Sequence, residues 1–173
     1  MDIIGIRQTQ VACAIAGLIN SAYRGTSGER RWTTENGLIE GDRISTQAVA
    51  DIILDKKYRV FAAFDENDQP HCCIAVEFDE IAKTAEFGMF AVHPEKQGTG
   101  LGSELLKHAE TYALKRAELF RVSVVNLNQQ LIEFYKRRGY QATGEELAYP
   151  LEANVGQPVK ENITLVVLEK SVA

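Results

Sequence analysis

The sequence predicts an α/β fold in which a mixed β-sheet carries helices on its faces. Strand-like and helix-like stretches follow one another in the order β-α-α-β-β-β-α-β-α-β-β, which amounts to about seven strands and four helices. Two nearly continuous apolar runs, 85–92 and 119–125, are typical of strands buried on both faces of a sheet. A helix-patterned stretch follows each run, as expected where helices connect strands and pack on the sheet.

The N-terminal part is expected to contain one strand and two helices. Residues 2–7 alternate between polar and apolar types, and Thr9 can cap the helix that follows. Gly, Ser, Thr and charged residues interrupt the pattern from 21 to 42, after which Ser45 or Thr46 can cap a second helix. The apolar residues at helical spacing are Val11, Ile15, Leu18 and Ile19 in the first helix, and Val49, Ile52 and Ile53 in the second.

A β-hairpin is expected in the middle of the chain. Residues 59–65 and 71–78 have strand patterns, and the turn-rich stretch Glu-Asn-Asp-Gln-Pro separates them. Adjacent Cys72 and Cys73 would point to opposite faces of the second strand. Together with Cys13 they make an odd count without metal-ligand spacing, which favours small buried thiols over a disulfide framework or a zinc site.

The C-terminal half returns to alternating helices and strands. An amphipathic helix is expected from 101 to about 116, before the apolar run 119–125. Further expected elements are a helix from the cap Asn128 to Arg138 that ends at Gly139 in a left-handed conformation, and strands at 140–148 and 163–170. Because no internal repeat or low-complexity tract appears, residues 1–173 are expected to form a single domain.

Size, composition and charge limit the functional classes. The chain has 173 residues with 45% hydrophobic and 25% charged content, which is ordinary for one globular domain. No run approaches the roughly 18 apolar residues of a membrane span, and the N-terminal residues show no signal-peptide pattern. The formal net charge of −5 argues against a nucleic-acid partner. The three histidines also lack metal-ligand spacing, so we expect a cytoplasmic protein without a nucleic-acid partner, a membrane span or a metal.

A glycine-rich turn after the run 85–92 is the most informative motif. Residues 93–102 read His-Pro-Glu-Lys-Gln-Gly-Thr-Gly-Leu-Gly. Glycines let backbone N–H groups approach a ligand, and a helix N-terminus attracts anions, so the turn is suited to holding a phosphate group. A Walker loop is excluded because Ser103 stands where its second glycine belongs. Ser103 also replaces the third glycine of a dinucleotide fingerprint, and Asn126 stands where that motif needs an acid.

The pattern that remains resembles the acyl-CoA pyrophosphate loop of the GNAT superfamily of N-acetyltransferases. Gln97-Gly98-Thr99-Gly100-Leu101-Gly102 fits Q/R-x-x-G-x-G/A. About thirty residues later, Asn128, Leu131, Phe134-Tyr135 and Gly139-Tyr140 fit N-x-x-A/L-x-x-F/L-Y-x-x-x-G-F/Y, which resembles the family's second motif. The order of elements also resembles the family over nearly the whole chain. The resemblance therefore implies a GNAT-type, mostly antiparallel twisted sheet.

Acetyl-CoA is the acyl donor that this resemblance implies. Backbone N–H groups of the turn would hold its pyrophosphate, and the end of the strand 85–92 would pair with the pantetheine arm. Gln97 would brace the turn, while Asn128 would bind the pantetheine or cap its own helix. Candidates for the 3′-phosphate are Lys96, Lys136 and Arg137. The implied cofactor-binding residues are Phe90, Ala91, Val92, Gln97, Gly98, Thr99, Gly100, Leu101, Gly102, Ser103, Asn128 and Tyr135.

Acetyl transfer to an amine needs a base for the amine and an acid for the departing thiolate. The resemblance assigns the acid to Tyr135, because a phenol with a pKa near ~10 can protonate a thiolate whose conjugate acid titrates near ~8.5. The alternative interpretation is that Tyr135 is only a core residue at helical spacing. Glu86 stands where some members have a general base, and apolar Phe87 and Met89 beside it would raise its pKa. The alternatives are that Glu86 faces solvent and that water accepts the proton.

The irregular segment 23–45 is expected to help form the acceptor pocket. Arginines in it could bind a carboxylate on the acceptor, and Trp32 could form a wall of the pocket. Equally, the segment could be a solvated loop anchored by Trp32. The arginines concerned are Arg24, Arg30, Arg31 and Arg43, and the substrate candidates are Arg24, Arg31, Trp32 and Glu86.

The leading hypothesis is an acetyl-CoA-dependent N-acetyltransferase that acts by direct transfer in a ternary complex. Its acceptor would be a primary amine of a small molecule or of a peptide or protein. The alternative is a non-catalytic acyl-CoA sensor or interaction module on the same fold. The presence of both Tyr135 and Glu86 favours the enzyme. Pairing of edge strands would allow a homodimer.

Overall fold

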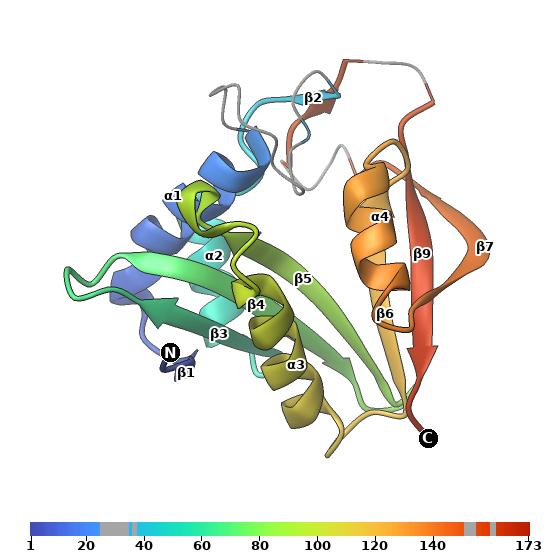
Figure 1. The fold of residues 1–173 in the computed structure, drawn as a ribbon, viewed down its shortest axis with the longest axis horizontal. Helices are drawn as coiled ribbons and strands as arrows, with labels where there is room; N and C mark the ends of the chain where they lie inside the picture. The colour runs from blue at the N-terminus through green and yellow to red at the C-terminus, as the bar shows by residue number, and fades with distance from the viewer. Residues whose placement is uncertain (25–34, 36–37, 151–154, 160–161) are drawn as a thin grey trace.

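Seven strands form one sheet in the computed structural model, which describes residues 1–24, 35, 38–150, 155–159 and 162–173 (Figure 1). The strand order is β1-β3-β4-β5-β6-β9-β7, and among the described residues of this sheet only β5 and β6 pair in parallel. In that order the strands are Ile4–Ile6, Tyr58–Phe64, Pro70–Asp79, Thr84–Val92, Leu119–Val125, Thr164–Ser171 and Gln141–Ala148. The mixed, mostly antiparallel sheet predicted from the sequence is thereby confirmed.

Helices cover both faces of the sheet (Figure 1). Helices α1 (Ala12–Arg24) and α2 (Thr46–Leu54) pack on one face, and α3 (Leu101–Ala113) and α4 (Gln129–Lys136) on the other. The alternation of side chains along β4 separates the two cores, since Cys72 belongs to the α3/α4 core and Cys73 to the α1/α2 core. No helix in the described part of the chain is long and apolar enough to cross a membrane.

Local chemistry sets most of the helix ends. The Ser45 hydroxyl accepts a hydrogen bond from the Ala48 N–H at 3.1 Å, which selects Ser45 over Thr46 as the cap of α2. Asn128 caps α4, and Gly139 follows that helix with a φ of 93°, both as predicted. The prediction for Thr9 was wrong: it begins a 3₁₀ turn (Thr9–Val11) that leads into α1 without a side-chain cap.

Two elements differ from the pattern in the sequence. Helix α3 ends at Ala113, three residues earlier than expected, because residues 114–116 tighten into turns that include an Arg116 N–H to Ala113 carbonyl bond of 2.9 Å. A second, two-stranded sheet pairs β2 (Ile39–Glu40) with β8 (Gln157–Pro158). Strands of two residues carry no periodicity that could have predicted them.

The sheet opens between β5 and β6. Their parallel pairing covers only Thr84–Phe87 and Leu119–Val122, and beyond it the two strands diverge (Figure 1). The register between β4 and β5 shifts at the same level, where Met89 has a φ of 50°, and such a bulge bends its strand. The bulge therefore accounts for the opening between β5 and β6. This opening lies directly before the glycine-rich turn.

Candidate functional site

The glycine-rich turn joins β5 to the N-terminus of α3. Gly98 and Gly100 adopt φ values of 81° and 86°, in the left-handed region that only glycine enters without strain. Gly100 is the N-cap residue of α3, so no side chain caps the first N–H groups of that helix. The Gln97 side-chain amide donates to the Val92 carbonyl at 3.0 Å, and the Thr99 hydroxyl donates to the Lys96 carbonyl at 2.6 Å. These bonds fix the turn against β5, and the geometry suits an anion.

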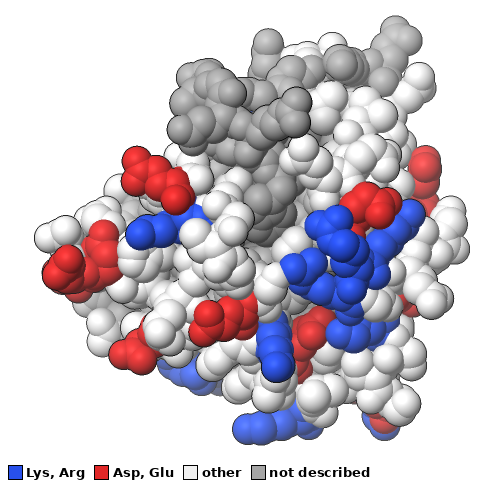
Figure 2. Space-filling view, in the orientation of Figure 1, with Lys and Arg blue, Asp and Glu red and all other residues white. Residues whose placement is uncertain are grey.

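A cavity of about 630 Å³ lies between this turn and α4. The turn contributes Gln97, Gly98, Gly100, Gly102 and Ser103, and α4 with the residues that follow it contributes Gln129, Gln130, Glu133, Phe134, Arg137 and Arg138. Lys and Arg side chains gather over α4 (Figure 2). Positive charge is therefore concentrated beside the turn even though the chain as a whole is acidic.

Arg138 is a member of this cavity that the motifs did not predict. Its guanidinium lies over the Phe134 ring at 3.5 Å from the centroid and donates to the Phe134 carbonyl at 2.8 Å. It also donates to the Ser103 hydroxyl, and burial lowers its pKa. Arg138 thus connects the end of α4 to the start of α3. The only available signal was its place before Gly139 in the second motif.

The three candidates for the 3′-phosphate are distributed differently. Arg137 lines the cavity beside the turn. Lys136 forms an ion pair of 3.7 Å with Glu133 on the same helix and does not line that cavity. Lys96 lines a separate surface cavity between α1 and the β3–β4 turn. Of the three candidates, only Arg137 lines the cavity between the turn and α4.

Two buried polar atoms beside the opening match the amide groups of a pantetheine arm. The Gln97 Oε1 and the Asn128 Nδ2 are both buried, and neither has a hydrogen-bond partner among the described residues. Asn128 uses its Oδ1 to cap α4, accepting from the Leu131 N–H at 3.3 Å, so its Nδ2 remains available as a donor. Buried polar atoms almost always have partners. The Gln97 Oε1 can accept a hydrogen bond and the Asn128 Nδ2 can donate one. Together they fit a ligand that contains amide groups, as coenzyme A does.

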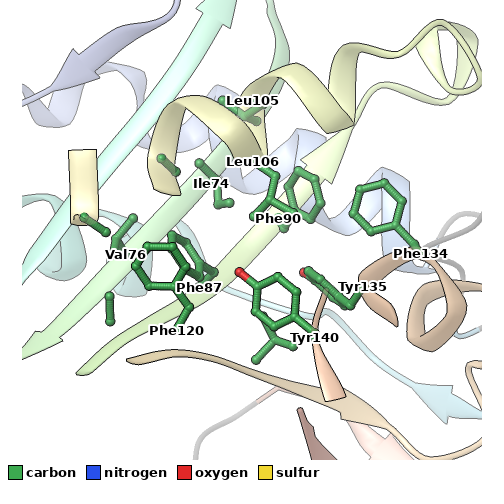
Figure 3. Close-up of a cluster of buried hydrophobic side chains, with 14 of the residues drawn as sticks. Ile74, Val76, Phe87, Phe90, Leu105, Leu106, Phe120, Phe134, Tyr135 and Tyr140 are labelled. Carbon is green, nitrogen blue, oxygen red and sulfur yellow. The ribbon is translucent and has the colours of Figure 1, made fainter. Parts of the chain in front are cut away.

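A second cavity, of about 490 Å³, occupies the opening between β5 and β6. Tyr135 and Glu86 both line it, together with Tyr23 and Phe90. The Tyr135 side chain comes from α4 and packs with Phe134 and Tyr140, at 5.4 Å between ring centroids in each case (Figure 3). Only 3% of the residue is exposed, and burial raises the pKa of its hydroxyl well above the usual value. The phenol is therefore held in its protonated form.

Glu86 lies in the same cavity, on the part of β5 that still pairs with β6. Its carboxylate accepts a hydrogen bond from the Ser123 hydroxyl at 3.1 Å and lies 3.8 Å from Arg121 Nε. The side chain is 40% exposed, and burial is the largest cause of its raised pKa. Glu86 is therefore in contact with both the cavity and solvent, which suits a group that exchanges protons.

One wall of this cavity is built around a buried ion pair that the sequence did not reveal. Arg24 pairs with Glu35, and the two side chains are 8% and 6% exposed. Arg24 also donates to the Val155 carbonyl at 2.6 Å and to the Tyr149 hydroxyl at 3.3 Å. The guanidinium expected to bind an acceptor carboxylate thus already has a carboxylate partner within the chain. Glu35 stands within the irregular segment 23–45, where no pattern in the sequence indicated this pairing.

The other residues that the sequence analysis expects in the acceptor pocket fall into two groups. Arg43 lines the cavity, 5.8 Å from the centroid of the Tyr23 ring, with no carboxylate at ion-pair distance in the described part of the chain. Arg30, Arg31 and Trp32 lie outside the described residues. No group of three or more His, Cys, Asp or Glu side chains arranged to hold a metal occurs among the residues that the structure describes.

Fold and site together define a class: an open mixed sheet with a glycine-rich turn after β5 and a cavity in its opening that is lined by Tyr135 and Glu86. This is the arrangement of an acyl-CoA-dependent transferase. The model of the GNAT acetyltransferase domain family matches residues 56–142, half of the chain. The chain belongs to this family of acetyl-transferring enzymes. No match is found among curated proteins.

Solved structures show the same fold at low identity, two of them over 99% of the chain. A variant of the spermidine N-acetyltransferase from Vibrio cholerae is 16% identical, with 99% of this chain and 95% of that one covered and a TM-score of 0.67. A protein from Acinetobacter baylyi that is assigned to the acetyltransferases is 15% identical, with coverage of 99% and 92% and a TM-score of 0.73. Nourseothricin acetyltransferase is 22% identical over 69% of this chain and 68% of that one, with a TM-score of 0.57.

Proposed function

We propose that the chain transfers the acetyl group of acetyl-CoA to a primary amine of a small molecule or of a peptide or protein. The observation that carries this proposal is the convergence of Tyr135 and Glu86 on one cavity in the opening between β5 and β6, while a second cavity lies at the glycine-rich turn that follows β5. The similar structures include enzymes named for spermidine and nourseothricin, which supports an amine acceptor. Residues 1–173 would act as one cytoplasmic GNAT domain.

The donor side would be formed by the turn and by the diverging end of β5. Backbone N–H groups of Gly98, Thr99, Gly100, Leu101, Gly102 and Ser103 would bind the pyrophosphate, with Arg137 and Arg138 beside them. Phe90, Ala91 and Val92 would align the pantetheine arm as an added strand in the opening. Gln97 and Asn128 would bind its amides through their unpaired atoms. Acetyl-CoA, when bound, supplies the thioester carbonyl that the amine attacks.

Tyr135 would act as the general acid. As the new C–N bond forms and the C–S bond breaks, its hydroxyl would give a proton to the departing sulfur. The raised pKa of the buried phenol keeps the hydroxyl protonated, so that its proton is available when the C–S bond breaks. The packing of Phe90, Phe134 and Tyr140 around the ring restricts its movement.

Glu86 would accept the proton from the incoming ammonium, directly or through water. Its contact with solvent allows the proton to leave, and the Ser123 hydroxyl orients the carboxylate. A carboxylate base gives a rate that rises with pH as the group ionises. In Glu86→Gln this dependence on the carboxylate should disappear from the pH–rate profile. An unchanged profile would leave water as the base.

The acceptor would bind between α1 and the segment near Tyr149. Arg24 would hold Glu35 in the wall of the cavity rather than bind the acceptor itself. Arg31 and Trp32 remain acceptor candidates from the sequence, and no metal would be needed. The transfer would be direct, without an acetylated enzyme, because both candidate groups in the cavity exchange protons with the reactants.

Two measurements test the proposed function. Titration with acetyl-CoA, NAD and ATP should show binding of acetyl-CoA alone. Release of free thiol should then be followed with a panel of amines that includes polyamines, aminoglycosides, amino acids and peptides. Turnover of any amine supports the enzyme. Binding of acetyl-CoA without turnover across the panel would support the alternative of an acyl-CoA sensor, and no binding would reject both.

A further inference from the structure

Tyr23 connects the last turn of α1 to the bulge in β5, 67 residues away in the sequence. Its hydroxyl donates to the Phe90 carbonyl at 2.7 Å, and only 8% of the residue is exposed. The neighbouring Arg24 turns toward Glu35 instead. Neither the motifs nor the family resemblance assigns a role to Tyr23, although it lines the same cavity as Tyr135.

The backbone that Tyr23 holds is irregular. Ala75 pairs with Gly88 and Cys73 with Ala91, so Met89 and Phe90 both lie opposite the single residue between them in β4. Met89 has a φ of 50°, which is rare for a side chain of its kind, and its carbonyl accepts a hydrogen bond from the Cys73 thiol at 3.2 Å. Two successive carbonyls are thus held by side chains. Because a peptide unit is planar, fixing its carbonyl also fixes the direction of its N–H group.

The hydrogen bond from Tyr23 matters because the bulge lies where β5 borders the opening. Beyond Phe87, β5 no longer pairs with β6, so its edge faces the opening. Along that edge, alternate residues point their backbone groups in the same direction. The carbonyl of Phe90 is held by Tyr23, and that of Val92 by the Gln97 amide at 3.0 Å. Two side chains, Tyr23 from the cavity in the opening and Gln97 from the glycine-rich turn, therefore hold the edge on which an acyl arm would be aligned.

We propose that Tyr23 is a positioning residue that sets the acyl end of the donor against Tyr135 by fixing the Phe90 peptide unit. This inference rests on the proposed function. The Tyr23 hydroxyl directs its proton to the Phe90 carbonyl, so it orients the strand while Tyr135 supplies the proton for the reaction. Burial raises the pKa of the Tyr23 hydroxyl, which keeps that bond made at every pH at which the fold is used.

The experiment compares Tyr23→Phe with wild type and with the control Tyr112→Phe. Tyr23→Phe removes one oxygen and leaves the ring that packs in the core. Tyr112 lies on α3, away from both cavities of the site, where its ring contacts Phe61 and Phe78. Calorimetry gives the dissociation constants of coenzyme A and acetyl-CoA for each protein. Thermal unfolding of each protein, and thiol release with any amine that wild type acetylates, are measured alongside.

A positioning role predicts a change specific to the acyl end. For Tyr23→Phe we expect the dissociation constant of coenzyme A to stay within about twofold, and that of acetyl-CoA to rise about fivefold to tenfold. A small misplacement of reacting groups can lower a rate on the order of a hundredfold, so kcat should fall between about tenfold and a hundredfold. Tyr112→Phe should match wild type in all of these values.

Each other outcome has a distinct meaning. If Tyr23→Phe binds both ligands and turns over like wild type, the positioning role is overturned while the proposed function stands. If it weakens both ligands equally and lowers the unfolding temperature, Tyr23 serves only the fold and the inference is likewise overturned. If wild type itself binds neither ligand, the proposed function fails, and the inference fails with it.

Discussion

The proposed donor side and the proposed acceptor side of the site are built in opposite ways. The donor side consists mainly of backbone groups from one continuous stretch, 97–103, presented by two left-handed glycines and a helix start. The acceptor side depends on side chains from segments far apart, in which Arg24 joins Glu35, Tyr149 and Val155. A common donor can be held by a reusable local motif, whereas an acceptor specific to one enzyme needs contacts that can vary residue by residue.

The largest effect is expected where the two sides meet. Tyr135→Phe removes the proposed acid without changing the packing of the ring, so kcat should fall about 10³-fold. The KM for acetyl-CoA should stay within about threefold, because the turn is untouched. Steady-state kinetics with the best acceptor of the panel measures both values. An unchanged kcat would assign Tyr135 to the core alone.

The next effect concerns the fold of the acceptor side. Arg24→Ala leaves the Glu35 carboxylate buried without its partner, which should lower the free energy of unfolding by about 3–5 kcal/mol. Lys83→Ala is the matched control, since its pair with Glu118 is 60% and 56% exposed and solvent screens the two charges, so its loss of stability should be much smaller. Urea unfolding measures both. Similar losses in the two variants would show that the Arg24 pair does not support the acceptor side.

Glycine substitutions sharpen the contrast on the donor side. Gly100→Ala puts a side chain at a φ of 86° with no other atom within 4 Å of the new Cβ, so the cost is backbone strain of about 1–2 kcal/mol. If the backbone relaxes to relieve that strain, the N–H groups of the turn would point away from acetyl-CoA. The dissociation constant of acetyl-CoA should therefore rise about tenfold, which corresponds to about 1.4 kcal/mol.

Gly144→Ala is the control for this prediction. Gly144, on the edge strand β7, has a φ of 82° and equally free surroundings. Its substitution should lower the unfolding temperature by a similar amount and leave acetyl-CoA binding unchanged. Equal binding by both variants would show that the conformation of Gly100 is not needed for the donor.

The smallest effect is a pH dependence of stability at Glu86. Its folded-state pKa is raised, so its contribution to stability is full below the ordinary carboxyl pKa and is lost as pH rises through the raised value. The Glu86→Gln variant has no carboxyl group to ionise, so it does not lose this stability as pH rises. The unfolding temperature of the variant relative to wild type should therefore increase between pH 4 and pH 8, as measured by thermal scans. A flat difference for Glu86→Gln would contradict the raised pKa.

Predictions from the sequence were correct where a residue affects the backbone conformation within a few positions of itself. Ser45 and Asn128 cap their helices, and Gly139 ends α4 in the left-handed conformation. Prediction failed at Thr9 and at the end of α3, where propensity gives only an approximate boundary. The pairing of Arg24 with Glu35 could not be foreseen, because nothing in local spacing relates the two residues.

The sequence by itself determined the order of elements, the glycine-rich turn and the two motifs that indicate the family. These features follow from rules that act within a few residues: periodicity, capping and the conformational freedom of glycine. Tertiary structure alone decided that β5 separates from β6 after Phe87, that Tyr135 and Glu86 share one cavity, and that Tyr23 reaches Phe90. Such contacts join residues tens of positions apart, and they exist only once the sheet has brought the segments together.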